Sequence, residues 1–321
     1  MTISIAVCST QRTTLAQAIA FIKHYEKIGM EKIIIFFDDP DDENIKTIEG
    51  LKNVITIRCS DEYWETASGR SKSVEQRQMY NSDYALDLCQ QLHIDWLLHV
   101  DVDEFIHFDN LKSAPGYFKN IPDNIVTIRF PVCESIPETQ EHTNFWSEIK
   151  NFRSHPVDYK NSIKMPFYIK LRTKINLLMV KLKKSFLILT GNGRYLEYGY
   201  MKAYIAGKSA TRVKANVKLM GLHVSNIIYK KNEFGTISND ACILHFDAFS
   251  YIAWHQKWLK RIDGRGTSTL MHNERYQQLL DFEKHYNSKD NDALKILYKE
   301  IYFIDKKGKF LLKKLGLIKA L

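Results

Sequence analysis

Short apolar runs alternate with helical patterns through the first 130 residues, and this alternation limits the fold more than any other feature. Helical periodicity occupies Leu15–Gly29 and continues again from Ser73 to about His93. Nearly continuous apolar strands joined by helices predict an α/β fold, with a mainly parallel sheet and helices on both faces. The predicted strands are ISIAV (3–7), KIIIFF (32–37), VITIR (54–58), WLLHV (96–100) and IVTIRF (125–130).

The rhythm changes after Phe130. Residues 131–200 are rich in aromatic residues and lysines and favour no particular element, whereas CILHF (242–246) predicts a further strand. A helix is predicted over 249–262, and the pattern of the remaining residues is helical. We therefore expect a helical, basic C-terminal extension over 263–321.

Charge and cysteine content narrow the classes of function. The formal net charge of the 321 residues is +9, which favours anionic partners or simply reflects a basic surface in water. The five cysteines are scattered, with no CxxC pair, so a disulfide framework or a zinc site is not expected. No signal-peptide pattern and no run of about 18 apolar residues is present, and we expect a cytoplasmic protein.

Three acids follow the apolar run WLLHV: Asp101, Asp103 and Glu104. Like charges this close repel, so the segment needs a positive partner or open contact with water. On extended chain, Asp101 and Asp103 point to the same side and Glu104 points elsewhere. Ligands bind at the carboxyl ends of parallel strands, where Mg²⁺ or Mn²⁺ takes one or two carboxylates together with substrate phosphates. The pattern predicts a metal–diphosphate site, with an ordinary polar loop as the alternative.

A diphosphate needs more positive charge than one cation supplies, and Arg forks suit phosphate. Asp38, at the end of the second strand, is a candidate for binding a ribose or a base, or else caps the loop DDPDD. Neither GKSATR (207–212) nor GNGRYL (191–196) has the glycine spacing of a nucleotide-binding loop. The candidate phosphate-binding cations are Arg12, Lys72, Arg77, Lys208 and Arg212.

The chain resembles bacterial family 2-type glycosyltransferases of the GT-A fold, a group that shares a DxDEF signature with family 92 enzymes. The resemblance covers about half of the chain, concentrated in 1–110 and 205–262. It implies a Rossmann-like GT-A domain over 1–262, with a nucleotide-sugar half (1–130) and an acceptor and metal-completing half (131–262). The matching residues are Ile33–Asp39, Gln76–Arg77, Asn81, Trp96–Phe105, GKSATR, GLH (221–223) and ILHFDAFSYIAWHQKW (243–258).

The same resemblance implies further site residues. A histidine from a late strand commonly completes the metal site in such enzymes, which indicates His245, with His223 as the alternative. Thr10 and Gln76 join the predicted donor-binding residues. For the base that takes a proton from the acceptor hydroxyl we favour Glu134. The other candidate bases are Glu138, Glu197 and Asp240.

The last sixteen residues, KKGKFLLKKLGLIKAL (306–321), contain six lysines and no acid, and their apolar residues share one helical side. Such a helix lies on an anionic membrane surface, or packs its apolar side on the domain with the lysines in water.

The leading hypothesis is a metal-dependent glycosyltransferase that uses Mn²⁺ or Mg²⁺ and a nucleotide-sugar donor. Its acceptor is a glycan or lipid-linked glycan, in bacterial surface polysaccharide or lipooligosaccharide synthesis, with no nucleic-acid partner. The C-terminal helix then places the protein on the inner face of the cell membrane. The alternatives are an aspartyl phosphatase, although Phe105 stands where that class has Thr or Val, and a basic RNA-binding module.

Overall fold

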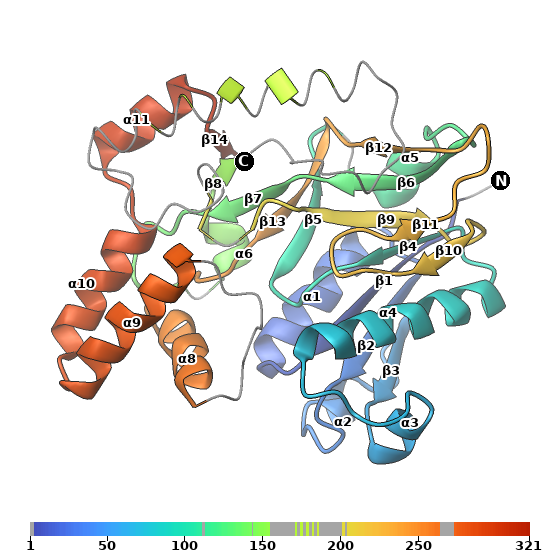
Figure 1. Cartoon of the computed structure of the whole chain (residues 1–321), viewed down its shortest axis with the longest axis horizontal. Helices are drawn as coiled ribbons and strands as arrows, with labels where there is room; N and C mark the ends of the chain where they lie inside the picture. Colours follow the sequence, from blue (N-terminus) through green and yellow to red (C-terminus); the bar gives the residue numbers. More distant parts are fainter. Residues whose placement is uncertain are drawn as a thin grey trace. The chain divides into compact units, whose positions relative to one another are not determined.

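The computed structural model describes residues 3–110, 113–142, 144–154, 201–202, 204–263 and 273–321, with seven further residues between 171 and 185 (Figure 1). Glu197 and the GNGRYL segment lie outside the described residues. The chain forms two compact units. Unit 1 comprises Met1–Pro131, Tyr159–Phe167 and Ala206–Ile243, and unit 2 comprises Val132–Asp158, Tyr168–Ile205 and Leu244–Leu321.

A seven-stranded sheet forms the centre of unit 1, in the order β12-β6-β9-β4-β1-β2-β3. Among the described residues, β9 runs antiparallel to both its neighbours, and the other neighbouring pairs in this sheet are parallel. The strands are β1 (Ile5–Gln11), β2 (Lys32–Phe37), β3 (Val54–Arg58), β4 (Trp96–His99), β6 (Ile125–Phe130), β9 (Lys208–Arg212) and β12 (Phe234–Ile237).

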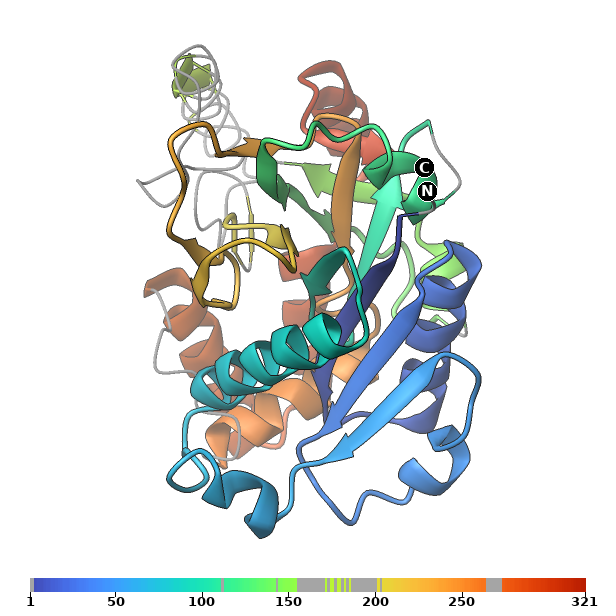
Figure 2. The ribbon, with the colours of Figure 1, turned by 90° about the vertical axis from the view of Figure 1, so that its right-hand side faces the viewer.

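Successive residues of the central strands enter two different cores, as the apolar runs predict. Ile33 and Ile35 of β2 pack in one core with Phe21 of α1 (Leu15–Lys27). Ile34 packs in the other core with Leu86 of α4 (Val74–Gln91). Figure 2 shows the blue helix α1 and the teal helix α4 on opposite sides of these strands. The prediction of a mainly parallel sheet covered on both faces is confirmed.

The bounds of both helices follow from local chemistry. The Ser73 hydroxyl accepts a hydrogen bond from the Gln76 backbone N–H and caps α4, as the capping pattern predicts. Thr14 caps α1 in the same way, through the Gln17 N–H. After α1 the chain turns at Gly29 with φ +85°, a conformation that residues with a Cβ rarely adopt.

Short helices complete unit 1, and two short strands form a separate antiparallel pair in it. Among the helices, α2 and α5 contribute to the α1 core, and α3 contributes Trp64 to the α4 core. These elements are α2 (Ile45–Ile48), α3 (Asp61–Glu65), α5 (Ala114–Phe118), β10 (Val217–Leu219) and β11 (Asn226–Ile227).

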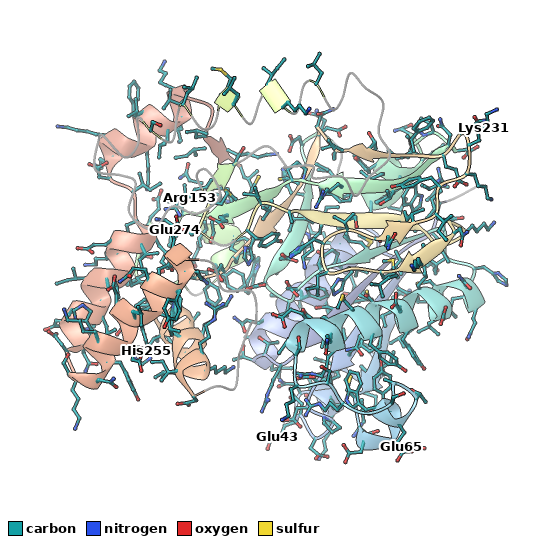
Figure 3. All side chains as sticks on the ribbon, viewed as in Figure 1. Glu43, Glu65, Arg153, Lys231, His255 and Glu274 are labelled. Atoms are coloured by element: carbon teal, nitrogen blue, oxygen red, sulfur yellow. The ribbon has the colours of Figure 1, made fainter. Side chains whose placement is uncertain are left out.

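A five-stranded sheet has the order β14-β8-β7-β13-β5. In unit 2, α8 (Tyr251–Ile262), α9 (Asn273–Asn287) and α10 (Asn291–Tyr302) surround an aromatic core. His255 of α8, labelled in Figure 3, packs against Phe282 of α9 with the ring centroids 5.4 Å apart. The remaining elements are β5 (Glu104–Phe108), β7 (Val132–Ser135), α6 (Phe145–Glu148), β8 (Asn151–Ser154) and β13 (Ala241–His245).

The C-terminal region is helical, as predicted, except at its last strand. In α11 (Lys306–Lys314), Leu312 packs with Ile136 in a small core of unit 2, and β14 (Ile318–Ala320) pairs antiparallel with β8. Leu312, Leu317 and Ile318 of the tail therefore pack on the protein, in agreement with one of the two alternatives, whereas Phe310 is exposed. Among the described residues, no helix is both long enough and apolar enough to cross a bilayer. The division at residue 262 stays a prediction.

Leu98 tests the core under β4. It is 0% exposed, so Leu98→Ala is expected to lower the free energy of unfolding by about 2–5 kcal/mol, through lost burial and a cavity. Leu15→Ala is the matched control, because Leu15 is 37% exposed and its truncation is expected to cost well under about 1 kcal/mol. Urea unfolding followed by tryptophan fluorescence measures both. Equal midpoints for the two variants would contradict the described packing.

Candidate functional site

Asp101–Glu104 forms a tight turn between β4 and β5, and we call this segment the acidic turn. The Glu104 N–H donates to the Asp101 carbonyl oxygen at 3.0 Å. The Glu104 carboxylate in turn accepts from the Asp101 N–H at 2.8 Å. Glu104 therefore folds back on the turn instead of pointing elsewhere, because β5 begins directly at this residue.

Lys208 supplies the positive charge that the acidic turn needs. Its Nζ lies 3.0 Å from Asp101 Oδ2 and 3.3 Å from Glu104 Oε2. The Lys208 side chain is 1% exposed and that of Glu104 is 0% exposed. Burial disfavours the charged ammonium, but the two carboxylates outweigh it and raise the pKa of Lys208 above its ordinary value. Lys208 is therefore charged at neutral pH.

The direction of β9 decides where its two predicted cations lie. β9 is antiparallel to β4, with Ala210 opposite Leu98 and Arg212 opposite Trp96. Lys208 therefore lies at the carboxyl end of β4. Arg212 lies four residues further, about 13 Å along the strand at ~3.3 Å per residue, toward the amino end. There it donates to the Ile125 carbonyl at 2.9 Å, apart from the acidic turn.

Gly207 makes the approach of β9 possible. Its φ is +69°, and a Cβ at this position would lie 2.2 Å from the Phe130 carbonyl oxygen. Only glycine fits both the dihedral angle and the space, so Gly207 is required for Lys208 to enter the sheet beside β4.

One face of α4 bonds the carboxyl ends of three neighbouring strands. Arg77 contacts Asp38 after β2, Gln78 Nε2 donates to Asp101 Oδ1 at 2.7 Å after β4, and Asn81 Nδ2 donates to Thr10 Oγ1 at 2.8 Å on β1. The Asn81 amide oxygen accepts from the Tyr63 hydroxyl at 2.7 Å. Asn81 lies four residues after Arg77 and three residues after Gln78, so it is next to both on the helix surface, which explains how one helix reaches all three strands.

Arg77 and Asp38 form a buried two-bond pair. Arg77 Nε lies 2.7 Å from Asp38 Oδ1, and Arg77 Nη2 lies 2.9 Å from Asp38 Oδ2. Arg70, which is 42% exposed, adds a second cation at 3.2 Å. Burial raises the pKa of Asp38, but hydrogen bonds and charge from Arg77 and then Arg70 outweigh it and lower the pKa below its ordinary value. The pair also holds the loop before α4, because Arg77 donates to the carbonyls of Ser71 and Lys72.

Two histidines near Lys208 are neutral at physiological pH. Burial, with a smaller contribution from the charge of Lys208, lowers the pKa of His99 to about 4 and that of His223 to about 3. His223 Nδ1 lies 3.2 Å from the Gly207 carbonyl oxygen. Neutral imidazoles do not add cations for a phosphate group, so Lys208 provides the charge in this cluster.

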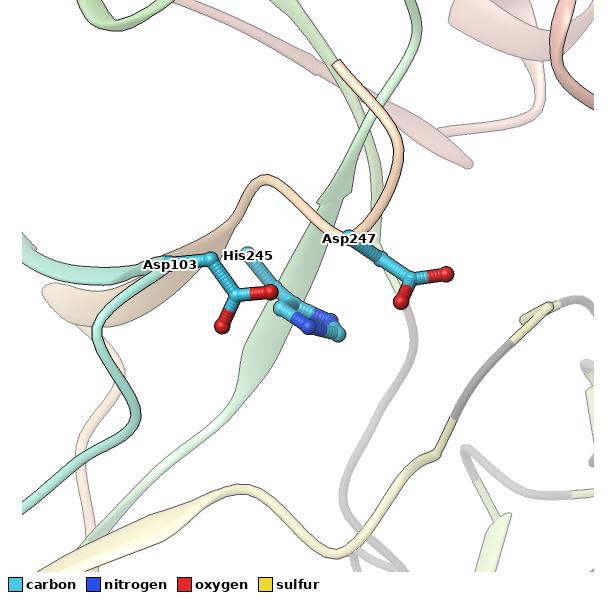
Figure 4. Close-up of side chains that lie close together, drawn as sticks. All are labelled: Asp103, His245 and Asp247. Carbon is cyan, nitrogen blue, oxygen red and sulfur yellow. The ribbon is translucent and has the colours of Figure 1, made fainter. Parts of the chain in front are cut away.

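Asp103, His245 and Asp247 each offer one ligand atom, and these atoms lie within 4.8 Å of one another (Figure 4). Asp103 directly precedes β5, and His245 is the last residue of β13. One imidazole and two carboxylates form a donor set that fits Mn²⁺, and the carboxylates also suit Mg²⁺. Asp101 is not part of this group.

Asp247 is also bonded within unit 2. Its Oδ2 accepts from the Arg275 NH2 nitrogen at 3.0 Å and from the Tyr302 hydroxyl at 3.2 Å, and Lys257 bonds its Oδ1. Burial raises the pKa of Asp247, but Arg275 and Lys257 outweigh it and hold the pKa well below its ordinary value. Asp247 is therefore an anion in a fixed position.

The other predicted site residues lie in two kinds of environment, exposed and buried. Arg12 and Lys72 are exposed, with Arg12 3.8 Å from Asp39. Gln76 is also exposed, and its side chain bonds the Ser71 hydroxyl. Glu134, on β7, is 4% exposed and accepts from the Lys202 N–H at 2.8 Å.

Gln78 and Asp247 are site residues that were not expected from the sequence. Gln78 could have been found from its helical spacing, because it shares a face of α4 with Arg77 and Asn81. Asp247 was visible two residues after His245 in the segment HFD.

Comparisons with known proteins give distant relatives. No family model matches the chain. A protein of Arabidopsis thaliana named "Glycosyltransferase-like At2g41451" is 22% identical over 272 residues, covering 75% of this chain and 53% of that protein. A second, "Glycosyltransferase-like At3g57200", is 22% identical over 263 residues, covering 75% of this chain and 46% of that protein. The chain thus spans about half the length of these curated relatives.

Solved structures give weaker similarities. A glycosyltransferase involved in glycosylation of the major capsid of PBCV-1 has a TM-score of 0.22 at 15% identity, over 40% of this chain and 51% of that chain. A CMP:2-keto-3-deoxy-manno-octonic acid synthetase complexed with CTP has a TM-score of 0.26 at 10% identity, over 42% and 54%. Scores this low carry no argument about fold or activity.

The Arg77–Asp38 pair is tested by comparing the two arginines. Arg77→Met is expected to lower the free energy of unfolding by about 3 kcal/mol at pH 7, because it removes the buried partner of a buried carboxylate. Arg70→Met is expected to cost under about 1 kcal/mol, because Arg70 is 42% exposed and solvent screens its charge. Chemical denaturation measures both losses.

The pH dependence of the Arg77→Met loss follows from the direction of the Asp38 shift. A lowered folded-state pKa contributes stability above the unfolded value of about 4, and that contribution is lost as pH falls through the folded-state pKa. The Arg77→Met loss should therefore shrink in acid. A loss that is constant from pH 7 to pH 3, or equal losses for the two variants, would contradict the pairing.

Proposed function

We propose that this chain is a metal-dependent glycosyltransferase that moves a sugar from a nucleotide-sugar donor to a glycan acceptor. The observation that carries the proposal is the position of the acidic turn. It leaves the carboxyl end of β4, inside a mainly parallel sheet with helices on both faces. That edge is where open α/β sheets bind their ligands. Two relatives named glycosyltransferase-like, aligned over 75% of the chain, support the same class of reaction.

Asp103 and His245 are the proposed cation ligands, and Asp247 is the third member of the donor set. When bound, Mn²⁺ or Mg²⁺ would offset the negative charge that develops on the departing diphosphate. Asp101 stays a predicted ligand and donor-binding residue. Both of its carboxylate oxygens accept hydrogen bonds in this structure, from Gln78 and Lys208.

The residues at the strand ends of unit 1 would orient the donor. Asp38 and Thr10, held in place by Arg77 and Asn81, are the proposed nucleoside contacts. Arg12 and Lys72 are exposed cations in the loops that follow β1 and precede α4, where they are available to an anionic donor. Both carboxylate oxygens of Asp38 already bond to arginines, so the carboxylate is held in one orientation.

Glu134 is the proposed base for the acceptor hydroxyl. Its carboxylate is buried, and the Lys202 N–H fixes one oxygen, so the group would take up a proton at a defined position. A hexosyl donor and an acceptor from bacterial surface polysaccharide or lipooligosaccharide are the proposed substrate classes. They rest on the family resemblance of the motifs.

Asp103→Asn tests the cation site with little change of shape. Donor turnover is expected to fall by about a hundredfold, a loss of ~3 kcal/mol in transition-state stabilisation, because the variant loses a ligand charge. His245→Ala should reduce turnover less and raise the Mn²⁺ concentration required. Release of nucleoside diphosphate from a panel of nucleotide sugars, with and without EDTA, measures both effects.

Asp109→Asn is the matched control for this experiment, because Asp109 carries the same charge at the far end of β5 and lies outside the proposed ligand set. It should leave turnover within about twofold of the wild type. Full activity of Asp103→Asn, or wild-type activity that EDTA does not change, would rule out the metal-dependent mechanism.

An anionic membrane surface is the proposed partner of the C-terminal helix. Leu312 is buried, but Phe310 is 65% exposed, and the Lys314 ammonium lies 5.6 Å from its ring centroid. Four lysines of this region are exposed, Lys314 among them: Lys306, Lys307, Lys313 and Lys314. One exposed aromatic ring among exposed lysines suits the boundary of an anionic bilayer, at about 1 kcal/mol per lysine.

Substitution tests this surface better than deletion, because removing the tail would also uncover Ile136 and remove the strand β14 that pairs with β8. Changing the four exposed lysines of α11 to Gln is expected to weaken binding to phosphatidylglycerol vesicles by at least about tenfold. The matched control changes Lys284, Lys289, Lys295 and Lys299, exposed on or just beyond α9 and α10, to Gln with the same loss of charge. Equal weakening by both sets would mean that only net charge matters.

A further inference from the structure

The place of the Lys208 ammonium is unusual for a lysine. It lies within 3.3 Å of two carboxylates, one on each end of the acidic turn, and it is 1% exposed. Glu104, one of the two, is 0% exposed. A cation shared by two carboxylates of one turn is an arrangement that proteins also give to divalent metals.

Two further hydrogen bonds hold the carboxylates that face this ammonium. Gln78 Nε2 donates to Asp101 Oδ1 at 2.7 Å, and the Asp101 N–H donates to Glu104 Oε2 at 2.8 Å. Each bond comes from the protein itself and fixes the direction of one carboxylate. The cation beside Asp101 is therefore the Lys208 ammonium of the chain itself.

We propose that Lys208 is a positioning residue that replaces a divalent cation between Asp101 and Glu104, and so directs the bound metal to Asp103. The effect on the metal at Asp103 rests on the proposed cation site. The replacement of a metal by the Lys208 ammonium does not, because it is argued from residues of unit 1 alone. Lys208 acts through the acidic turn and is not itself a contact of the donor, because its side chain is buried.

Removing the ammonium leaves the two carboxylates without a counter-charge. Lys208→Met keeps most of the side-chain length, so the change is mainly electrostatic. The Asp101 and Glu104 carboxylates then repel each other where little water screens their charges, and this repulsion destabilises the fold. An added divalent cation can relieve the repulsion. Lys208→Arg keeps the charge, and Lys208→Met with Glu104→Gln removes one charge of each sign.

Thermal melts of the full chain in EDTA and in excess MnCl₂ test the proposal with the metal alone. In EDTA, Lys208→Met is expected to melt roughly 5 °C or more below the wild type. MnCl₂ should raise its melting temperature by clearly more than it raises that of the wild type, because the cation enters the vacated place. Lys208→Arg should recover most of the wild-type melting temperature in EDTA.

The double variant separates this role from simple packing. Lys208→Met with Glu104→Gln should recover stability in EDTA and lose the additional response to MnCl₂. Should Lys208→Met fail to fold in EDTA, the refolding yield with MnCl₂ replaces the melt, and the yield should rise for the single variant but not for the double variant.

The proposal is overturned if Lys208→Met and the wild type gain equally from MnCl₂, or if the double variant keeps the additional gain. These readouts need no sugar donor. If the chain proves not to be a glycosyltransferase, turnover is absent in every variant while the MnCl₂ response of Lys208→Met persists. If only the present inference fails, turnover still depends on Asp103 while that response is ordinary.

Discussion

The contact between the Lys208 ammonium and the carboxylates of Asp101 and Glu104 is the interaction on which the rest of unit 1 depends. Two acids at the end of a buried strand are unstable without a cation, and one lysine serves both. To reach them, β9 has to enter the sheet against the direction of its neighbours, and Gly207 has to pass close to the Phe130 carbonyl. The acidic turn therefore has its counter-charge only when β9 takes this place in the sheet, so the electrostatics of the turn and the topology of the sheet depend on each other.

Helix α4 adds a second layer of control. One side of this helix carries Arg77, Gln78 and Asn81, and each of these side chains bonds the end of a different strand. Because those side chains lie on one rigid helix, the three strand ends keep a common alignment. A site built in this way is preorganised, so a ligand that binds there does not have to order the groups that contact it.

The sequence predicted the parallel part of the fold well, because Ile33 to Phe37 and Trp96 to Val100 carry unambiguous apolar runs. It did not predict β5, since Glu104 read as one more acid of a loop, nor did it predict β9 or its antiparallel direction. The positions of Asp101, Asp103 and Asp38 at strand ends could be predicted from spacing. The pairing of Lys208 with Asp101 could not, because it joins residues 107 positions apart, and no local pattern records which cation meets which acid.

The insertion of β9 between β4 and β6 also determines when the sheet of unit 1 can be completed during synthesis of the chain. The chain up to Pro131 supplies β4 and β6, but the strand that lies between them is made of residues 208–212. While the chain is being synthesised, both strands therefore present open edges and the acidic turn has no lysine beside it. About eighty more residues must emerge before that sheet can close. A protein of this design exposes strand edges of its central sheet to aggregation until residues 208–212 have been made.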